Sequence, residues 1–264
     1  MVTDERAAGG DLLPAPPSVG FPRCRCCPVP RTAAGRRCLL CPEQGVPGGN
    51  APRRCAACGQ QRVAGRPCPT PWCGRPDRAW SVAFSVGEYT GALRYAILRY
   101  KYAGERWRAG AFARLIAGYL DRNSGWFDDF GVIVGTPAYT GPGARRSWDP
   151  VGHILAELRP IVGATWSVHP EVVAKQRETP PLSGRSAGER WTTAVGELRD
   201  ALVVPRSEVV RGERVLLLDD VMAEGSTLHE VGRALRSAGA VEVAGLVLAR
   251  PAWAAVGARS SPAG

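Results

Sequence analysis

All nine cysteines of this 264-residue chain lie between residues 24 and 73, and the rest of the sequence contains none. Eight of them form pairs, which are Cys24 and Cys27, Cys38 and Cys41, Cys55 and Cys58, and Cys68 and Cys73. Cys26 is left over. Two cysteines three positions apart can place both sulfurs on one metal ion, and two such pairs complete a tetrahedron. The spacing predicts two structural metal sites, one from the first two pairs and one from the last two.

Zinc is the metal that this ligand set favours, and an iron–sulfur cluster is the main alternative. The cysteine-rich segment is too polar to fold by apolar burial alone, so metal binding would supply its folding free energy. Disulfides need an oxidising compartment. The N-terminal sequence MVTDERAAGGDLLPAPPSVG does not resemble a secretory signal, so we expect a disordered tail over residues 1–20 and a cytoplasmic protein.

The formal net charge of +10 suggests acidic partners, such as nucleic acid or phosphorylated metabolites. Eight thiolates on two zinc ions would lower that charge to about +6, and a solvated basic surface is an equally good explanation. The longest apolar runs, Val215–Leu218 and Val243–Leu248, are strand-sized and far shorter than the roughly 20 residues of a membrane helix. We therefore expect no membrane span.

After Trp80 the pattern changes to alternating helices and strands. Apolar residues at helical spacing predict helices over about Gly91–Tyr102 and Arg108–Leu120, and a third that contains Val151–Leu158. Short apolar runs predict strands at 132–134, 172–174, 215–218 and 243–248. This alternation is typical of an α/β fold with a parallel sheet flanked by helices. We expect a double four-cysteine zinc module at 21–78, the α/β domain at 79–252 and a tail at 253–264.

The most informative stretch is VLLLDDVMAEGSTLHEVGRALRSAGA, residues 215–240. It predicts a buried strand that ends in Asp219 and Asp220, a loop that contains Gly225, and a helix from near Thr227 to Gly239. Such a unit directs backbone N–H groups and a helix dipole at one point, which suits a phosphate. The two carboxylates lie where open α/β sheets bind ligands, placed to take ribose hydroxyls or a hydrated magnesium ion.

This signature, together with YTGALRYAILRYKYAGE at Tyr89–Glu105, resembles the type I phosphoribosyltransferases. Within that group the chain is most similar to the ComF-like proteins, which join cysteine zinc hooks to this fold, and the resemblance covers most of residues 24–250. It implies a phosphoribosyl pyrophosphate ligand bound with Mg²⁺. It also implies transfer of the ribose 5-phosphate to a nucleophile with release of pyrophosphate.

The resemblance assigns site residues in three loops. It gives a 5-phosphate loop after the acidic pair, with Ala223, Gly225, Ser226 and Thr227, and a pyrophosphate loop, with Gly135, Thr136 and Pro137. It gives a basic catalytic loop with Lys175 and Arg177, which would stabilise charge on the departing pyrophosphate beside the catalytic Asp219 and Asp220. A solvated loop is the alternative for the two basic residues, and an ordinary turn for Thr136 and Pro137. For Lys101 we favour a polar helix face over a ligand contact.

Two departures from the family pattern leave the function open. The loop reads Ala223-Glu224-Gly225 where relatives have Thr-Thr-Gly or Thr-Ala-Gly, and residues 144–155 keep Arg145 and Arg146 but not the family's Arg-Gly-Phe-Asn-Gln run. Glu224 is then a catalytic proton acceptor, a brake on phosphate binding, or a solvent-facing carboxylate near the helix dipole.

Three functions fit these departures. The chain is an enzyme with an unusual acceptor, a non-catalytic nucleotide-binding regulator, or a ComF-like accessory factor for DNA uptake that binds single strands. The acceptor, and whether the protein is a homodimer, stay open.

Overall fold

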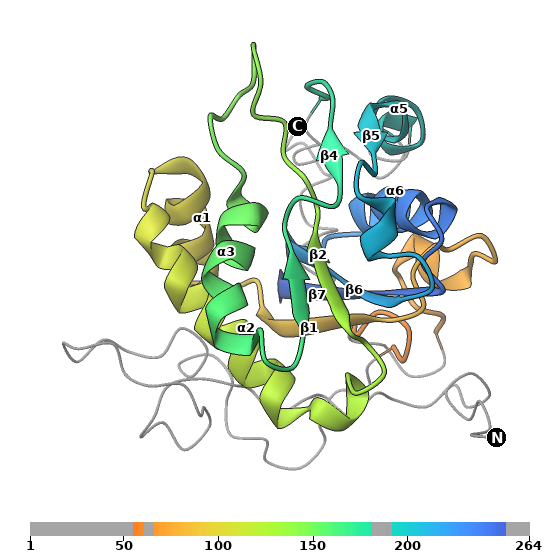
Figure 1. Cartoon of the computed structure of the whole chain (residues 1–264), viewed down its shortest axis with the longest axis horizontal. Coiled ribbons are helices and arrows are strands. Elements are labelled where there is room, and N and C mark those ends of the chain that lie inside the picture. Colours follow the sequence, from red (N-terminus) through yellow and green to blue (C-terminus); the bar gives the residue numbers. More distant parts are fainter. Residues whose placement is uncertain (1–54, 61–65, 181–188, 190–191, 252–264) are drawn as a thin grey trace.

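The computed structural model describes residues 55–60, 66–180, 189 and 192–251. Their centre is a five-stranded sheet with strand order β1-β7-β6-β2-β3, in which all pairs are parallel (Figure 1). The strands are β1 (Ala83–Glu88), β2 (Val132–Gly135), β3 (Ser167–His169), β6 (Arg214–Val221) and β7 (Glu242–Arg250). The expected parallel sheet is confirmed, and the edge strands β1 and β3 add to the strands expected from the sequence.

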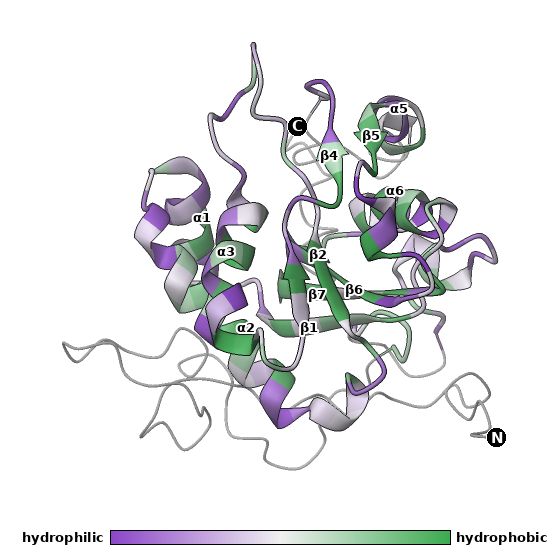
Figure 2. Ribbon diagram, in the orientation of Figure 1, coloured by the Kyte–Doolittle hydropathy of each residue, from purple (hydrophilic) through white to green (hydrophobic). Residues whose placement is uncertain are grey.

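Helices cover both faces of the sheet, because alternate side chains of each strand enter different cores. Leu216 and Leu218 pack with the helices on one face, whereas Val215 and Leu217 pack with the helix on the other. The first face carries α1 (Gly91–Tyr102), α2 (Ala109–Arg122) and α3 (Pro150–Val162), and the second carries α6 (Ser226–Ser237). Figure 2 shows the resulting hydrophobic strands and the polar outer surfaces of the helices.

The helices begin where the sequence pattern places them. α1 has the expected bounds, and α2 differs from its expected range by one or two residues at each end. α3 begins at Pro150, whose fixed φ suits the first helical turn, and the Asp149 carboxylate caps it by accepting the Val151 N–H at 3.0 Å. These contacts fix the chain that leads from β2 into α3.

A small two-stranded antiparallel sheet lies beside this core. It pairs β4 with β5, and β4 is the shortened form of the strand expected near 172–174. The remaining elements are β4 (Ala174–Lys175), β5 (Leu202–Val203), α5 (Arg199–Ala201), a π-helical turn η4 (Ala194–Leu198) and the 3-10 turns η1 (Pro71–Gly74), η2 (Arg106–Arg108), η3 (Ser124–Trp126) and η5 (Ser207–Val209). In the part of the chain that the structure describes, no helix has the length and apolar character needed to cross a bilayer.

The last four paired cysteines belong to the same packed body as the sheet. Cys55 and Cys58 share a buried cluster with Trp72, Trp80 and the inner side of α6. The expected first zinc site, formed by Cys24, Cys27, Cys38 and Cys41, and the two expected tails lie outside the described residues.

Candidate functional site

The carboxyl ends of β2 and β6 bring two of the predicted site segments together. The strands pair with Gly135 opposite Leu218, so the residues that follow, Thr136 and Asp219, are neighbours. The Thr136 hydroxyl donates a hydrogen bond to Asp219 Oδ1 at 2.8 Å, and the Thr136 N–H donates to the Leu218 carbonyl at 2.9 Å. The predicted pyrophosphate loop and the predicted acidic pair therefore form one cluster.

Gly135 is needed at this point because α3 packs directly against it. A Cβ atom built on Gly135 would lie 2.7 Å from Leu155 Cδ1 and 2.9 Å from Val151 Cγ1, both closer than side chains can approach. Glycine thus lets α3 pack against the end of β2. Thr136 and Pro137 follow directly, beyond the carboxyl end of the strand.

Lys101 enters the site from the end of α1. Its Nζ lies 2.6 Å from Asp220 Oδ2, and about a fifth of its side chain is exposed. The expectation that Lys101 belongs to a polar helix face is therefore wrong. The sequence could have predicted that Lys101 is largely buried, because it lies four residues after the core residue Ile97 and so on the same face of the helix.

The charges of this cluster shift one another's ionisation. Burial, followed by the charge of Asp220, raises the pKa of Asp219 to about 7. For Lys101, burial opposes the charged ammonium, but the charges of Asp220 and Asp219 keep its pKa above the usual value. Asp149, which the sequence reasoning missed, lies near enough for the charge of Asp220 to act on it, and burial raises its pKa. The site holds more acidic than basic groups, an arrangement that favours a bound cation.

The loop between β6 and α6 has the expected shape for an anion. Gly225 has a φ of +93° and is the N-cap of α6, so it offers no side chain to cap the first turn. The N–H groups at the start of α6 are not used by the helix itself, and the helix dipole adds positive potential there. Ala223 and Thr227 are partly exposed on either side, and Ser226 is buried as the first helical residue.

Glu224 is buried, with 4% of its surface exposed. The expectation of a solvent-facing carboxylate at this position is therefore wrong. Burying a carboxylate costs free energy unless it has partners, and Glu224 does make an interaction in the structure. The two other interpretations, a proton acceptor and a brake on phosphate binding, both place the side chain inside the loop.

The two predicted basic residues lie on or beside β4. Lys175 is in the strand and partly buried, and burial lowers its pKa. Arg177 is exposed and lies 3.8 Å from Glu197. Within the described part of the chain, neither residue forms a hydrogen bond or ion pair with Asp219 or Asp220. Their assignment to a catalytic loop stays a prediction.

Cys55, Cys58, Cys68 and Cys73 come together as the spacing predicts. Their four Sγ atoms lie within 4.8 Å of one another. The Cys55–Cys73 and Cys58–Cys68 sulfurs are 3.8 and 3.6 Å apart. A tetrahedron of sulfurs at about 2.3 Å from a central zinc ion has edges of about 3.8 Å, so the cluster fits zinc. All four ligand positions are filled by thiolates, which is typical of a structural site.

Comparison with known proteins supports the resemblance to phosphoribosyltransferases and ComF-like proteins. Residues 151–256 match the family model described as "Phosphoribosyl transferase domain". The chain is 26% identical over 222 residues to the DNA utilization protein YhgH of Salmonella typhi, which covers 82% of this chain and 86% of the relative. It is also 26% identical over 185 residues to competence protein F of Haemophilus influenzae, covering 67% of this chain and 76% of the relative.

Solved structures also match, including a phosphoribosylpyrophosphate synthetase from Mycobacterium smegmatis. That match has 15% identity and a TM-score of 0.31, and it covers 53% of this chain. The chain spans only 33% of the synthetase.

Proposed function

Because this chain resembles the ComF-like proteins and carries a phosphoribosyl transferase domain, we propose that it is a cytoplasmic protein that binds phosphoribosyl pyrophosphate with Mg²⁺. It transfers the ribose 5-phosphate to a nucleophile and releases pyrophosphate. The observation that carries the proposal is the contact of Thr136, Asp219, Asp220 and Lys101 at adjoining strand ends, directly before the loop that enters α6.

Each part of the ligand has a matching group in this arrangement. Asp219 and Asp220 accept hydrogen bonds from the ribose hydroxyls, and their oxygens suit the hard Mg²⁺ ion that neutralises the pyrophosphate. The backbone N–H groups at the start of α6 hold the 5-phosphate. Gly135, Thr136 and Pro137, which follow each other at the end of β2, line the pyrophosphate side of the site. The domain 79–252 is then the ligand-binding unit, and the zinc module 21–78 is structural.

Two further roles belong to this proposal. Lys175 and Arg177 stabilise the charge that develops on the leaving pyrophosphate when the β4 region closes over the ligand. Glu224 accepts the proton of the incoming nucleophile, and its burial within the proposed 5-phosphate loop supports this role.

Affinity for the magnesium-bound ligand is expected to rise with pH and to level off near pH 7. Asp219 holds a proton below its pKa of about 7 in the free protein, and this proton must leave when the carboxylate binds the ligand. The limiting slope is about tenfold in affinity per pH unit. Calorimetry from pH 5.5 to 8.5 measures this profile, with Asp219→Asn as the control that removes the proton. A flat profile in the wild-type protein would show that Asp219 does not ionise on binding.

Turnover is tested by release of pyrophosphate over a panel of bases and amines. With phosphoribosyl pyrophosphate and Mg²⁺ present, we expect release that depends on one acceptor class and is lost in Asp219→Asn. Tight binding without release for any acceptor would instead identify a non-catalytic regulator. The variant Glu224→Gln then assigns the proton acceptor, because a base predicts a large fall in turnover with ligand affinity kept.

Nucleic-acid binding is a second candidate function, favoured by one surface. Tyr95, Tyr102 and Trp107 are each about 60% exposed, on α1 and the turn that follows it. Arg146 lies 4.9 Å above the Tyr102 ring, and Arg108 lies 4.4 Å above that of Trp107. Exposed aromatic rings beside arginines provide stacking and phosphate contacts for single strands. Affinity for a single-stranded oligonucleotide that falls steeply with salt would support it.

A further inference from the structure

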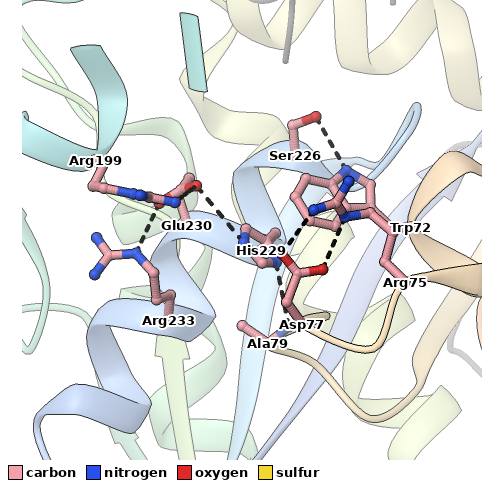
Figure 3. Close-up of polar contacts among 9 residues, drawn as sticks. All are labelled: Trp72, Arg75, Asp77, Ala79, Arg199, Ser226, His229, Glu230 and Arg233. Carbon is pink, nitrogen blue, oxygen red and sulfur yellow. Dashed lines mark hydrogen bonds and ion pairs between the residues drawn. The ribbon is translucent and has the colours of Figure 1, made fainter. Parts of the chain in front are cut away.

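The cysteine cluster reaches the 5-phosphate loop through a tryptophan. Trp72 lies between two of the clustered cysteines, Cys68 and Cys73, and is 1% exposed. Its indole N–H donates a hydrogen bond to the Ser226 hydroxyl at 3.3 Å, and its ring stacks on His229 with centroids 3.8 Å apart (Figure 3). Ser226 begins α6, so Trp72 contacts the helix at the point where the loop ends.

In this hydrogen bond the Ser226 oxygen is the acceptor, so the proton of the Ser226 hydroxyl stays available for donation to another group. A hydroxyl has one proton and two acceptor lone pairs, and an indole N–H only donates. When Trp72 occupies a lone pair of Ser226, the hydroxyl proton is directed elsewhere. The first residue of α6 is where the helix presents its free N–H groups, so the serine proton adds a further donor toward an anion at the loop.

The partners of His229 hold the stacked pair in place. His229 Nδ1 accepts the Ala79 N–H at 3.3 Å, and burial lowers its pKa, so the ring is neutral with its proton on Nε2. The neighbouring Glu230 is fully buried and pairs with Arg199 and Arg233, each at 2.9 Å (Figure 3). The middle of α6 is therefore held by these charge pairs, while its start is held by Trp72.

A second connection runs from the cysteine cluster to the other end of the loop. Arg250, at the end of β7, is 5% exposed, and its guanidinium donates to Gln60 Oε1, Thr70 Oγ1 and Met222 Sδ at 2.7 to 2.8 Å. The Thr70 Oγ1 and Cys58 Sγ atoms are 3.3 Å apart, and the Thr70 hydroxyl is the donor of this hydrogen bond when Cys58 is a metal-bound thiolate. Met222 is the first residue of the loop after β6, so this arginine joins it to the cluster.

The guanidinium of Arg250 forms no ion pair with a carboxylate among the described residues, although it is buried. A buried charge needs a counter-charge nearby. Four thiolates around one Zn²⁺ would carry a net charge of −2. The Thr70 hydroxyl contacts both Cys58 of this cluster and the guanidinium of Arg250, so only this hydroxyl separates the two. Zinc bound to the four cysteines would thus supply the compensating charge for Arg250, whose guanidinium contacts Met222.

We propose that the cysteine cluster is a positioning element for the 5-phosphate loop, with Trp72 as the positioning residue for the Ser226 hydroxyl and Arg250 as that for Met222. The inference rests on the proposed function, because it assigns these residues to the binding of the ligand's 5-phosphate. The module then acts on ligand affinity as well as on folding.

The test compares two buried tryptophans, of which only Trp72 has a hydrogen-bond partner for its indole N–H among the described residues. Trp80 also packs at the loop, since a Cβ on Gly225 would lie 3.3 Å from its ring, so Trp80→Phe controls for packing. Trp72→Phe removes the N–H that binds Ser226, whereas Trp80→Phe removes an N–H with no partner in the described part of the chain. Both side chains are 1% exposed. With ribose 5-phosphate as the probe in calorimetry, we expect Trp72→Phe to bind about three- to tenfold more weakly and Trp80→Phe to bind like wild type. Added to Ser226→Ala, Trp72→Phe should cost no further affinity.

Equal affinities in Trp72→Phe and wild type, or equal losses in the two phenylalanine variants, would overturn the inference. So would a full additional loss from Trp72→Phe in the Ser226→Ala background, because the effect would then come from packing. Absence of ribose 5-phosphate and phosphoribosyl pyrophosphate binding in the wild-type protein would overturn the proposed function itself, and the inference with it.

Zinc retention gives a readout that does not depend on activity. Coupling between two sites is reciprocal, so a ligand in the 5-phosphate loop must tighten zinc binding by the same factor that zinc tightens ligand binding. Saturating ribose 5-phosphate is expected to lower the zinc transferred to a chelator at equilibrium, for one zinc equivalent only. Trp72→Phe should reduce this protection and Trp80→Phe should keep it. Unprotected zinc in the wild-type protein, with ligand bound, would contradict the coupling.

Discussion

The double variant Asp219→Asn/Asp220→Asn is expected to lose measurable binding of phosphoribosyl pyrophosphate while it keeps its fold and zinc content. Each carboxylate gives the ligand a charge-assisted hydrogen bond of about 1.5–3 kcal/mol, and the pair provides the negative charge for the magnesium ion. Asparagine keeps the shape, and its Oδ1 can still accept from the Thr136 hydroxyl and from the Asp220 N–H, as Asp219 Oδ1 does now. Calorimetry measures the loss, and circular dichroism checks the fold.

The single variant Asp219→Asn is also expected to raise the melting temperature. The folded-state pKa of Asp219, about 7, lies above its ordinary value of 3.8. Between these values the folded protein holds a proton that the unfolded chain has released, so stability falls as pH rises from about 4 to about 7 and is then level. Asparagine does not titrate, so it removes this pH dependence. The increase in melting temperature of Asp219→Asn over wild type should therefore be larger at pH 8 than at pH 5.

Asp129→Asn is the matched control for both measurements. Asp129 pairs with Arg214 at the amino end of β6, the opposite end from the acidic pair, and half of its side chain is exposed. Removing such an exposed pair changes stability by less than about 1 kcal/mol. It should leave ligand affinity unchanged. Wild-type affinity in the Asp219/Asp220 double variant would remove both residues from the ligand site.

The variant Cys58→Ser is expected to lose one zinc equivalent and to be strongly destabilised. Cys58 is fully buried within the cluster that joins the zinc ligands to α6 and the sheet. Structural zinc sites contribute roughly 10 kcal/mol or more of apparent binding free energy to folding, so losing one removes an amount comparable with the whole stability of a domain. Metal analysis and thermal melting measure both effects, and wild-type protein should carry close to two zinc equivalents.

Cys26→Ser is the control for Cys58→Ser, because the other eight cysteines form the four pairs that make up the two expected metal sites. This variant should keep both zinc equivalents and the wild-type melting temperature. If Cys58→Ser also kept both, the four sulfurs would not form a metal site. If wild-type protein contained iron and showed visible charge-transfer absorption, the cysteines would hold an iron–sulfur cluster and not zinc.

Patterns that lie within one stretch of sequence predict this fold best. The strand, acidic pair, loop and helix of residues 215–240 are contiguous, and the structure has them as β6 and α6 with nearly the expected bounds. The strand at 172–174 is weaker, since only Ala174 and Lys175 pair, at the edge of a separate small sheet. The edge strands β1 and β3 depend on pairing with β7 and β2, which local periodicity does not report.

Contacts across the chain explain where the site differed from the expectation. The pairing of Lys101 with Asp220 needs α1 and β6 to end at the same place, and 119 residues separate the two side chains in sequence. Glu224 looks like a helix-start carboxylate by its position, yet the loop folds it inward. The hydrogen bond from Trp72 to Ser226 spans 154 residues and has no motif. Tertiary packing decides all three.

Calorimetry of the wild-type protein with phosphoribosyl pyrophosphate and Mg²⁺ tests the central claim most directly. We predict saturable binding at one site per chain, which weakens when Mg²⁺ is withheld and is lost in the Asp219→Asn/Asp220→Asn variant but kept in Asp129→Asn. Folded, zinc-loaded protein that shows no heat of binding with this ligand and none with ribose 5-phosphate would contradict the claim.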